Sequence, residues 1–246
     1  RMSHEIRTPM NGIIGMTAIA LQKEQSPERV LDCLQKIQSS STYLLGLIND
    51  ILDMSKIESG KMKLEAQDFP MEEMLDTIRE LIAPQASAKR LDFAVEAELA
   101  HSWFSADRMR ISQVLINLLG NAVKFTPEGG RVALEVRELP PDGKEEARVS
   151  FTVRDTGVGI AKEEQDRVFR AFEQASGANP AKQQGTGLGL SISSRLVQMM
   201  GSGIQLDSAL GKGSAFSFTI PLALGRPVQA GAAAEEISFA GYRILV

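Results

Sequence analysis

A histidine followed directly by an acid, His4-Glu5, stands near the start of the chain and has the residue types that nucleophilic chemistry needs. An imidazole with an ordinary pKa of about 6.5 is partly neutral near pH 7, so one ring nitrogen can attack an electrophile. The Glu5 carboxylate could hold the other ring N–H, fix the tautomer and take up a proton. A bare His-Glu pair also occurs on ordinary surfaces, so its meaning depends on the rest of the chain.

Three polar side chains further along have the spacing of a metal and phosphate site. Asn117, Asn121 and Lys124 stand at i, i+4 and i+7, which places them on one helix face. An amide oxygen is a hard ligand suited to Mg²⁺, and Lys124 could balance phosphate charge. By itself such a face is usually solvated.

Two glycine-rich stretches indicate a nucleotide. Asp155 follows a β-prone run and precedes Gly157 and Gly159, so its carboxylate could accept a hydrogen bond from an amine such as that of adenine while the glycine backbone approaches a flat ring. Residues 185–190 (Gly-Thr-Gly-Leu-Gly-Leu) open a helix whose N-terminus would favour phosphate. The third glycine of that stretch comes one residue too early for a dinucleotide fingerprint.

The elements that must position these residues begin with a helical hairpin. Apolar residues recur at helical spacing after His4, with Pro9 expected to kink or loosen the helix, and Ser26-Pro27-Glu28 is typical of a second helix start. A heptad seam follows, made of Val30, Leu34, Ile37, Ser41, Leu44, Ile48, Ile51 and Ser55. Pairing two hairpins into a dimeric four-helix bundle would bury it; a hairpin packed within one chain is the alternative.

The remaining pattern mixes helices and strands after a hinge at Ser59-Gly60. We expect an α+β chain in which the hairpin precedes an α/β sandwich, a sheet covered on one face by helices. The expected helices are 70–87, 107–125 and 188–200, and the expected strands are 61–69, 91–96, 131–138, 149–154, 203–208 and 214–221.

Composition excludes several classes of protein. The 246 residues are 43% hydrophobic and 24% charged, with a net charge of −4 that gives no reason to expect a nucleic-acid surface. The single cysteine, Cys33, rules out an internal disulfide framework and fits a reducing, cytoplasmic location. No apolar run approaches the length of a membrane span, so we expect no membrane contact within the chain. The chain looks like a piece of a longer protein.

Five motifs in order resemble the sensor histidine kinases of the HisKA class. Residues 4–9 resemble the H-box, 117–125 the N-box, 155–160 the G1 box, 169–172 the F-box and 185–190 the G2 box. The resemblance covers nearly the whole chain to about residue 222. It implies domains at 1–60 (dimerisation and histidine phosphotransfer) and 61–223 (GHKL-type ATP binding). A linker at 224–240 and the start of a receiver domain at 241–246, cut off by the end of the chain, would follow.

The resemblance also implies roles for individual residues. His4 would be phosphorylated from Mg²⁺-ATP and pass the group to a receiver, and Glu5 would orient and deprotonate it. Asn117 would help to hold Glu5 or the metal, and Thr8 would position water for receiver dephosphorylation. Asn121 would hold the metal. The ATP-contacting set would be Asn117, Asn121, Lys124, Asp155, Gly157, Gly159, Ile160, Phe172, Gly185, Thr186, Gly187, Leu188, Gly189 and Leu190.

Two other functions would also use some of these motifs: ATP hydrolysis, and dimerisation without catalysis. GHKL ATPases carry a glutamate base at the position of Asn117. Because an amide cannot take a proton from water, Asn117 makes efficient ATP hydrolysis unfavourable. A non-catalytic dimerisation scaffold would have no need for His4, Asn121 and Asp155 together.

Overall fold

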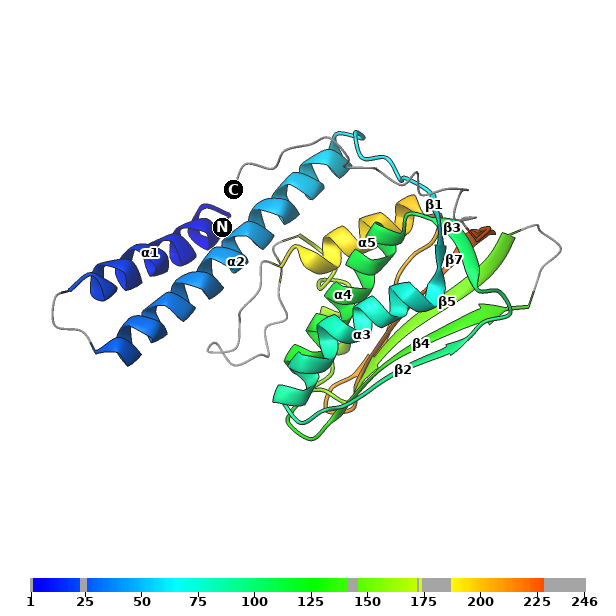
Figure 1. Ribbon diagram of the computed structural model, residues 1–246. Helices are drawn as coiled ribbons and strands as arrows, with labels where there is room; N and C mark the ends of the chain where they lie inside the picture. The colour runs from blue at the N-terminus through cyan, green and yellow to red at the C-terminus, as the bar shows by residue number, and fades with distance from the viewer. Residues whose placement is uncertain (1, 23–25, 141–145, 172, 174–186, 228–246) are drawn as a thin grey trace, which may run out of the picture.

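The chain folds into a helical hairpin followed by a sheet that helices cover on one face (Figure 1). The computed structural model describes residues 2–22, 26–140, 146–171, 173 and 187–227, with side chains from residue 6 onward. The expected order of a hairpin and then an α/β sandwich is therefore confirmed. In the described part of the chain, no helix combines the length and apolar character that crossing a membrane would need.

The hairpin consists of α1 (Met2–Ala20) and α2 (Pro27–Glu58). Ser26 caps α2 as predicted, because its Oγ accepts the Arg29 backbone N–H at 3.4 Å. Pro9 lies inside α1, which is nevertheless one continuous helix from Met2 to Ala20. The two helices lie side by side and antiparallel (Figure 1).

The segment after α2 differs from the predicted edge strand over 61–69. The chain turns at Gly60, which has a φ of +64°, and strand β1 covers only Gln67–Pro70. In between, Met62 is buried in the core, and the Glu65 N–H donates to the Asp107 side chain rather than to a neighbouring strand. The alternating polarity of residues 61–66 therefore comes from the buried Met62 side chain and not from a β-strand.

The sheet has the strand order β1-β3-β7-β5-β4-β2, with β6 paired to β7. The strand β3 was not predicted; the others extend or shorten the predicted runs by a few residues. The remaining strands are β2 (Asp92–Glu98), β3 (Trp103–Ala106), β4 (Arg131–Leu139), β5 (Glu146–Asp155), β6 (Gln205–Ala209) and β7 (Gly213–Leu224). β2 pairs parallel to β4, and the other pairs are antiparallel.

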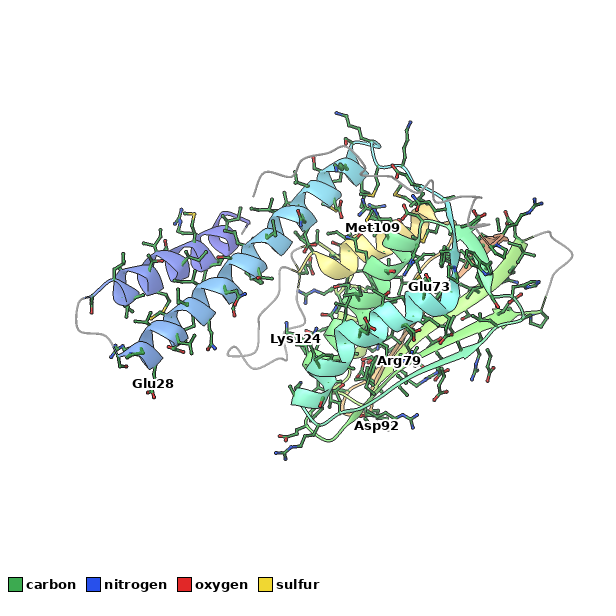
Figure 2. The ribbon with its side chains drawn as sticks, in the orientation of Figure 1. Glu28, Glu73, Arg79, Asp92, Met109 and Lys124 are labelled. Atoms are coloured by element: carbon green, nitrogen blue, oxygen red, sulfur yellow. The ribbon has the colours of Figure 1, made fainter. Side chains whose placement is uncertain are left out.

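Three helices cover one face of this sheet: α3 (Met71–Ala88), α4 (Arg108–Phe125) and α5 (Gly189–Met199) (Figure 1). A short 3₁₀ helix covers Lys162–Glu164. The core lies between helices and sheet, where Phe151 and Phe218 stack with ring centroids 5.1 Å apart. The opposite face is polar: Arg131 reaches Asp92 and Glu96 across the strands, and Figure 2 shows Asp92 at its rim.

Candidate active site

Helix α4 presents the three polar side chains that its spacing predicted. Its buried face is apolar, so Asn117, Asn121 and Lys124 are left half-buried on its other side. Asp107 caps the helix, since its Oδ1 accepts the Arg110 backbone N–H at 3.0 Å. Figure 2 shows Lys124 near the end of α4, on the side of the helix layer away from the sheet.

Asn117 joins α4 to the beginning of α5. Its Nδ2 donates to Ser193 Oγ at 2.9 Å. The backbone of Gly189 lies so close that a Cβ there would be 2.2 Å from Asn117 Oδ1. Glycine at 189 therefore allows a contact that any other residue would displace.

Asn121 and Lys124 differ in the contacts that their side chains make with neighbouring residues. The Asn121 amide makes no hydrogen bond to the residues that the structure describes, although it is half-buried. The Lys124 Nζ lies 4.8 Å from the centroid of the Phe125 ring, a cation–π distance. Burial lowers the pKa of the Lys124 ammonium, which makes a nearby anion favourable.

Asp155 ends β5 and retains 9% exposure. Its Oδ1 accepts the backbone N–H groups of Gly157 at 2.7 Å and Ser214 at 3.3 Å. Burial raises the pKa of the Asp155 carboxyl, and the two hydrogen bonds only partly offset this effect. Both bonds go to Oδ1, so among the described residues Asp155 Oδ2 receives no hydrogen bond.

The glycines after Asp155 bring backbone segments into contact. A Cβ on Gly157 would lie 2.8 Å from the Phe125 carbonyl oxygen at the end of α4. Gly159 has a φ of +68°, and a Cβ there would lie 2.0 Å from the Ala209 carbonyl oxygen. The Ile160 N–H donates to Ser208 Oγ at 2.8 Å. The loop is thus held between α4 and the β6–β7 turn.

The residues of that turn that support Asp155 were not predicted from the sequence. Gly213 has a φ of +91°, and a Cβ there would lie 2.0 Å from the Asp155 carbonyl oxygen. Ser208 Oγ is 3.0 Å from Ser214 Oγ and donates to the Gly213 carbonyl at 3.0 Å. The Gly-Lys-Gly-Ser run at 211–214 was the available signal, but only its last residue, Ser214, was predicted, as the start of a strand.

The second glycine stretch is described from Gly187 onward. Gly187 has a φ of +66°, Leu188 is fully buried, and α5 begins at Gly189, with Leu190 in its first turn. The predicted site residues Phe172, Gly185 and Thr186 lie outside the described residues. Phe169 packs edge-on against Phe216 with centroids 6.3 Å apart, so it belongs to the core.

The predicted nucleophile lies in the hairpin, in a different element from the nucleotide site. The backbone of His4 and Glu5 belongs to the first turns of α1, and their side chains lie outside the described residues. Thr8 follows one turn later and is exposed. Away from the hairpin, Asn117 is joined to the start of α5, and the loop after Asp155 packs against the end of α4, the helix that carries Asn121.

Comparisons with known proteins agree with this division. Residues 1–60 match the His Kinase A (phospho-acceptor) domain, and residues 106–224 match the histidine kinase-, DNA gyrase B-, and HSP90-like ATPase. The sensory/regulatory protein RpfC of Xanthomonas campestris is 39% identical over 93% of this chain and 31% of its own length. The sensor protein GacS of Pseudomonas syringae is 42% identical over 92% of this chain and 25% of its own length.

Solved structures show the same likeness. ShkA, crystallised full-length with AMPPNP, superposes with a TM-score of 0.69 at 35% identity, over 92% of this chain and 45% of its own. The histidine kinase ThkA, solved with the response regulator TrrA, gives 0.64 at 25% identity over 90% of this chain and 60% of its own.

An ATP-binding domain that follows a phosphoacceptor hairpin defines the catalytic core of a histidine kinase. The chain belongs to the sensor histidine kinases of two-component signalling. It spans less than a third of the length of the curated relatives named above.

Proposed function

We propose that this chain binds Mg²⁺-ATP and transfers the γ-phosphoryl group to His4. The observation that carries the proposal is that Asn117 of α4 bonds to the start of α5, while the glycine loop after Asp155 packs on the end of the same helix, in a chain whose first helix holds His4-Glu5. The proposal takes the region at 61–223 as the ATP-binding domain and the hairpin at 1–60 as its substrate.

The Asp155 carboxylate would select adenine. Its Oδ1 is occupied by two backbone N–H groups, which orient the carboxylate and leave Oδ2 for the exocyclic amine. Gly157 and Gly159 let the backbone approach the ring, and Ile160 and Phe172 would contact it. Within a buried setting, a charged acceptor is worth more than in water.

The phosphates would lie along the start of α5 and the end of α4. Backbone N–H groups of residues 185–190 and the helix dipole would bind the anionic oxygens, together with Lys124. The uncommitted, half-buried amide of Asn121 fits a Mg²⁺ ligand, with Asn117 as a neighbour one turn away. Bound Mg²⁺ would neutralise charge on the phosphate oxygens.

His4 would act as the nucleophile. One imidazole nitrogen bonds to the γ-phosphorus while the bond from the β–γ bridging oxygen to that phosphorus breaks, and ADP leaves. Glu5 would accept the N–H hydrogen bond and the proton, with Asn117 holding Glu5. Thr8, exposed one turn after His4, would position water when a phosphorylated receiver is dephosphorylated.

We further propose that the hairpin dimerises as a four-helix bundle. Large apolar side chains remain exposed on both helices, or directly after α1, within one chain: Met10, Ile14, Leu21, Leu31, Leu34, Tyr43, Leu45, Ile48 and Leu52. Those at 31, 34, 45, 48 and 52 follow heptad spacing. Half of the predicted seam faces inward instead, since Val30, Ile37, Leu44 and Ile51 are half-buried on the side of Cys33 and Leu47.

The onward partner would be a receiver domain, whose aspartate takes the phosphoryl group from His4. We propose residues 224–240 as a linker and residues 241–246 as the start of such a domain; both lie largely or wholly outside the described residues. Because the reaction consumes ATP, it would take place in the cytoplasm.

Labelling with γ-labelled ATP and Mg²⁺ tests the proposal. We expect label that acid removes and base does not, as for a phosphoimidazole and unlike phosphoserine. His4→Gln should lose this label while nucleotide affinity is unchanged, because His4 and the nucleotide pocket lie in separate elements. His101→Gln is the matched control and should be labelled normally. Label persisting at the original level in His4→Gln would refute the assignment.

A further inference from the structure

A closed set of hydrogen bonds joins α2 to the first turns of α4. Asp53 Oδ2 accepts from Arg110 Nη1 at 2.9 Å and from Gln113 Nε2 at 2.8 Å. Arg110 Nη1 also donates to Gln113 Oε1 at 2.7 Å. The three side chains, called here the Asp53 cluster, therefore bond to one another between the hairpin and the ATP-binding domain.

The Asp53 cluster is shielded from water. The Arg110 and Asp53 side chains retain 16% and 15% exposure, whereas those of Lys36 and Asp32, which pair at 2.7 Å on the same helix, retain 56% and 55%. A shielded ion pair is little screened by salt. Removing one partner is unfavourable because the other charge is then buried alone.

Apolar contact surrounds the cluster. Leu47 is fully buried and belongs to the same hydrophobic cluster as the core of the ATP-binding domain. Ile51, Met54 and Ile57 pack against this hydrophobic core, and α2 also contacts α5. Apolar surfaces can slide past one another, whereas a hydrogen-bonded ion pair selects one register.

Helix α4 links the cluster rigidly to the nucleotide site. Gln113, Asn117 and Asn121 are four residues apart, so they follow one helix face at intervals of about 6 Å. A displacement of Gln113 relative to α2 therefore displaces Asn121 as well.

The start of α4 is also fixed to the segment that follows the hairpin. The buried Asp107 caps α4 through Oδ1, and its Oδ2 accepts the Glu65 N–H at 3.1 Å. Arg110 of the Asp53 cluster and this cap lie in the same turn of α4. Together they hold the helix at its first turn.

On the hairpin side, Asp53 lies close to the level of the phosphoacceptor. Gly12 faces Ser40 across the hairpin, because a Cβ on Gly12 would lie 3.6 Å from Ser40 Oγ. In antiparallel helices the backbone of His4 then lies near the level of Ile48. Asp53 follows five residues later, about 7.5 Å along the axis.

We propose that Asp53 is a positioning residue for phosphoryl transfer. By binding Arg110 and Gln113 it sets the register in which the ATP-binding domain docks on α2, and so directs the phosphates held by α4 and α5 toward His4. The inference rests on the proposed autophosphorylation. Asp53 acts through α4 and not on the reacting atoms.

Asp53→Asn in the whole chain tests this role, because it removes the charge and keeps the shape. We expect kcat for autophosphorylation to fall by about 10- to 100-fold with the KM for ATP unchanged, since a misplacement of about 1 Å has effects of that size. Calorimetry should give an unchanged ATP affinity. Hydrogen exchange should become faster in residues 47–57 and in α5, where docking is lost.

Two further variants separate positioning from a general loss of stability. Asp32→Asn makes the same change on the same helix at an exposed pair, and should retain full kcat. Arg110→Asp should be as slow as Asp53→Asn, and combining it with Asp53→Arg should restore part of the rate by restoring the pair.

A kcat for Asp53→Asn that is unchanged or higher would overturn the proposal, as would unchanged hydrogen exchange in residues 47–57. Absence of acid-labile label in the unmodified chain would instead refute the proposed function. The two failures are therefore distinguished by the unmodified chain alone.

Discussion

The Asp155 carboxylate should strengthen nucleotide binding and, because it is buried, lower the stability of the fold. Asp155→Asn keeps the shape and an acceptor for the Gly157 N–H, but replaces a charged acceptor by an amide. We expect ATP affinity to fall by a factor of about 10 to 100, equivalent to ~1.5–3 kcal/mol for a hydrogen bond to a charged group. Calorimetry measures it, with Asp92→Asn on the opposite sheet face as the control. Equal affinities would show that Asp155 is only a turn residue.

The same substitution should stabilise the nucleotide-free protein in a pH-dependent way. Burial raises the pKa of Asp155 above the unfolded value of about 3.9, so the native state holds more protons than the unfolded state between the two values. The free energy of unfolding of the unmodified protein therefore falls, relative to Asp155→Asn, as pH rises through that window. Denaturant titrations at several pH values check it. A difference that shrinks toward neutral pH would contradict the buried charge.

At the scale of elements, the sequence predicted what local chemistry determines. The cap at Ser26 and the long helix at 107–125 depend on residues close in the chain, and both were predicted. Strand β3 was missed because four residues are too few to show the alternation of polar and apolar side chains that indicates a strand. Its pairing with β1 is also set by residues distant in the sequence. Residues 61–66 were predicted as a strand because the apolar Met62, which is buried, gives the segment an alternation of apolar and polar residues.

The β6–β7 turn offers a matched test of how it supports the site. Gly211 and Gly213 have φ values of +77° and +91°, but only Gly213 lacks space for a Cβ. Gly211→Ala should lower the free energy of unfolding by about 1 kcal/mol, from backbone strain alone. Gly213→Ala should lower it by about 2–5 kcal/mol, from strain plus overpacking, and weaken ATP binding by displacing Asp155. Equal effects in denaturant titrations would mean that the Asp155 contact is unimportant.

At the scale of the whole molecule, the residues proposed for the site come from segments that are far apart in the sequence. Asn117 and Asn121 come from α4, Asp155 from the end of β5, and Ser208 and Gly213 from the β6–β7 turn. Residue types and helical spacing were enough to select the first three. The turn could not be found in the same way, because its role follows from a strand pairing between Asp155 and Ser214. The Asp53 cluster likewise depends on docking that no local pattern encodes.

The proposed dimer gives the prediction that concerns the molecule as a whole. Ile48 is 42% exposed within one chain, so Ile48→Glu should leave the hairpin and the ATP-binding domain folded. In a four-helix bundle the added charge would be buried without a partner, which disfavours association by several kcal/mol. We expect monomers by light scattering at micromolar concentration, with unchanged ATP affinity and much slower autophosphorylation. Gln35→Glu adds the same charge on the same helix at an exposed polar position and should remain dimeric. If the unmodified chain is monomeric at that concentration and still labels His4, the bundle is refuted, and the exposed stripe of α2 must serve another contact.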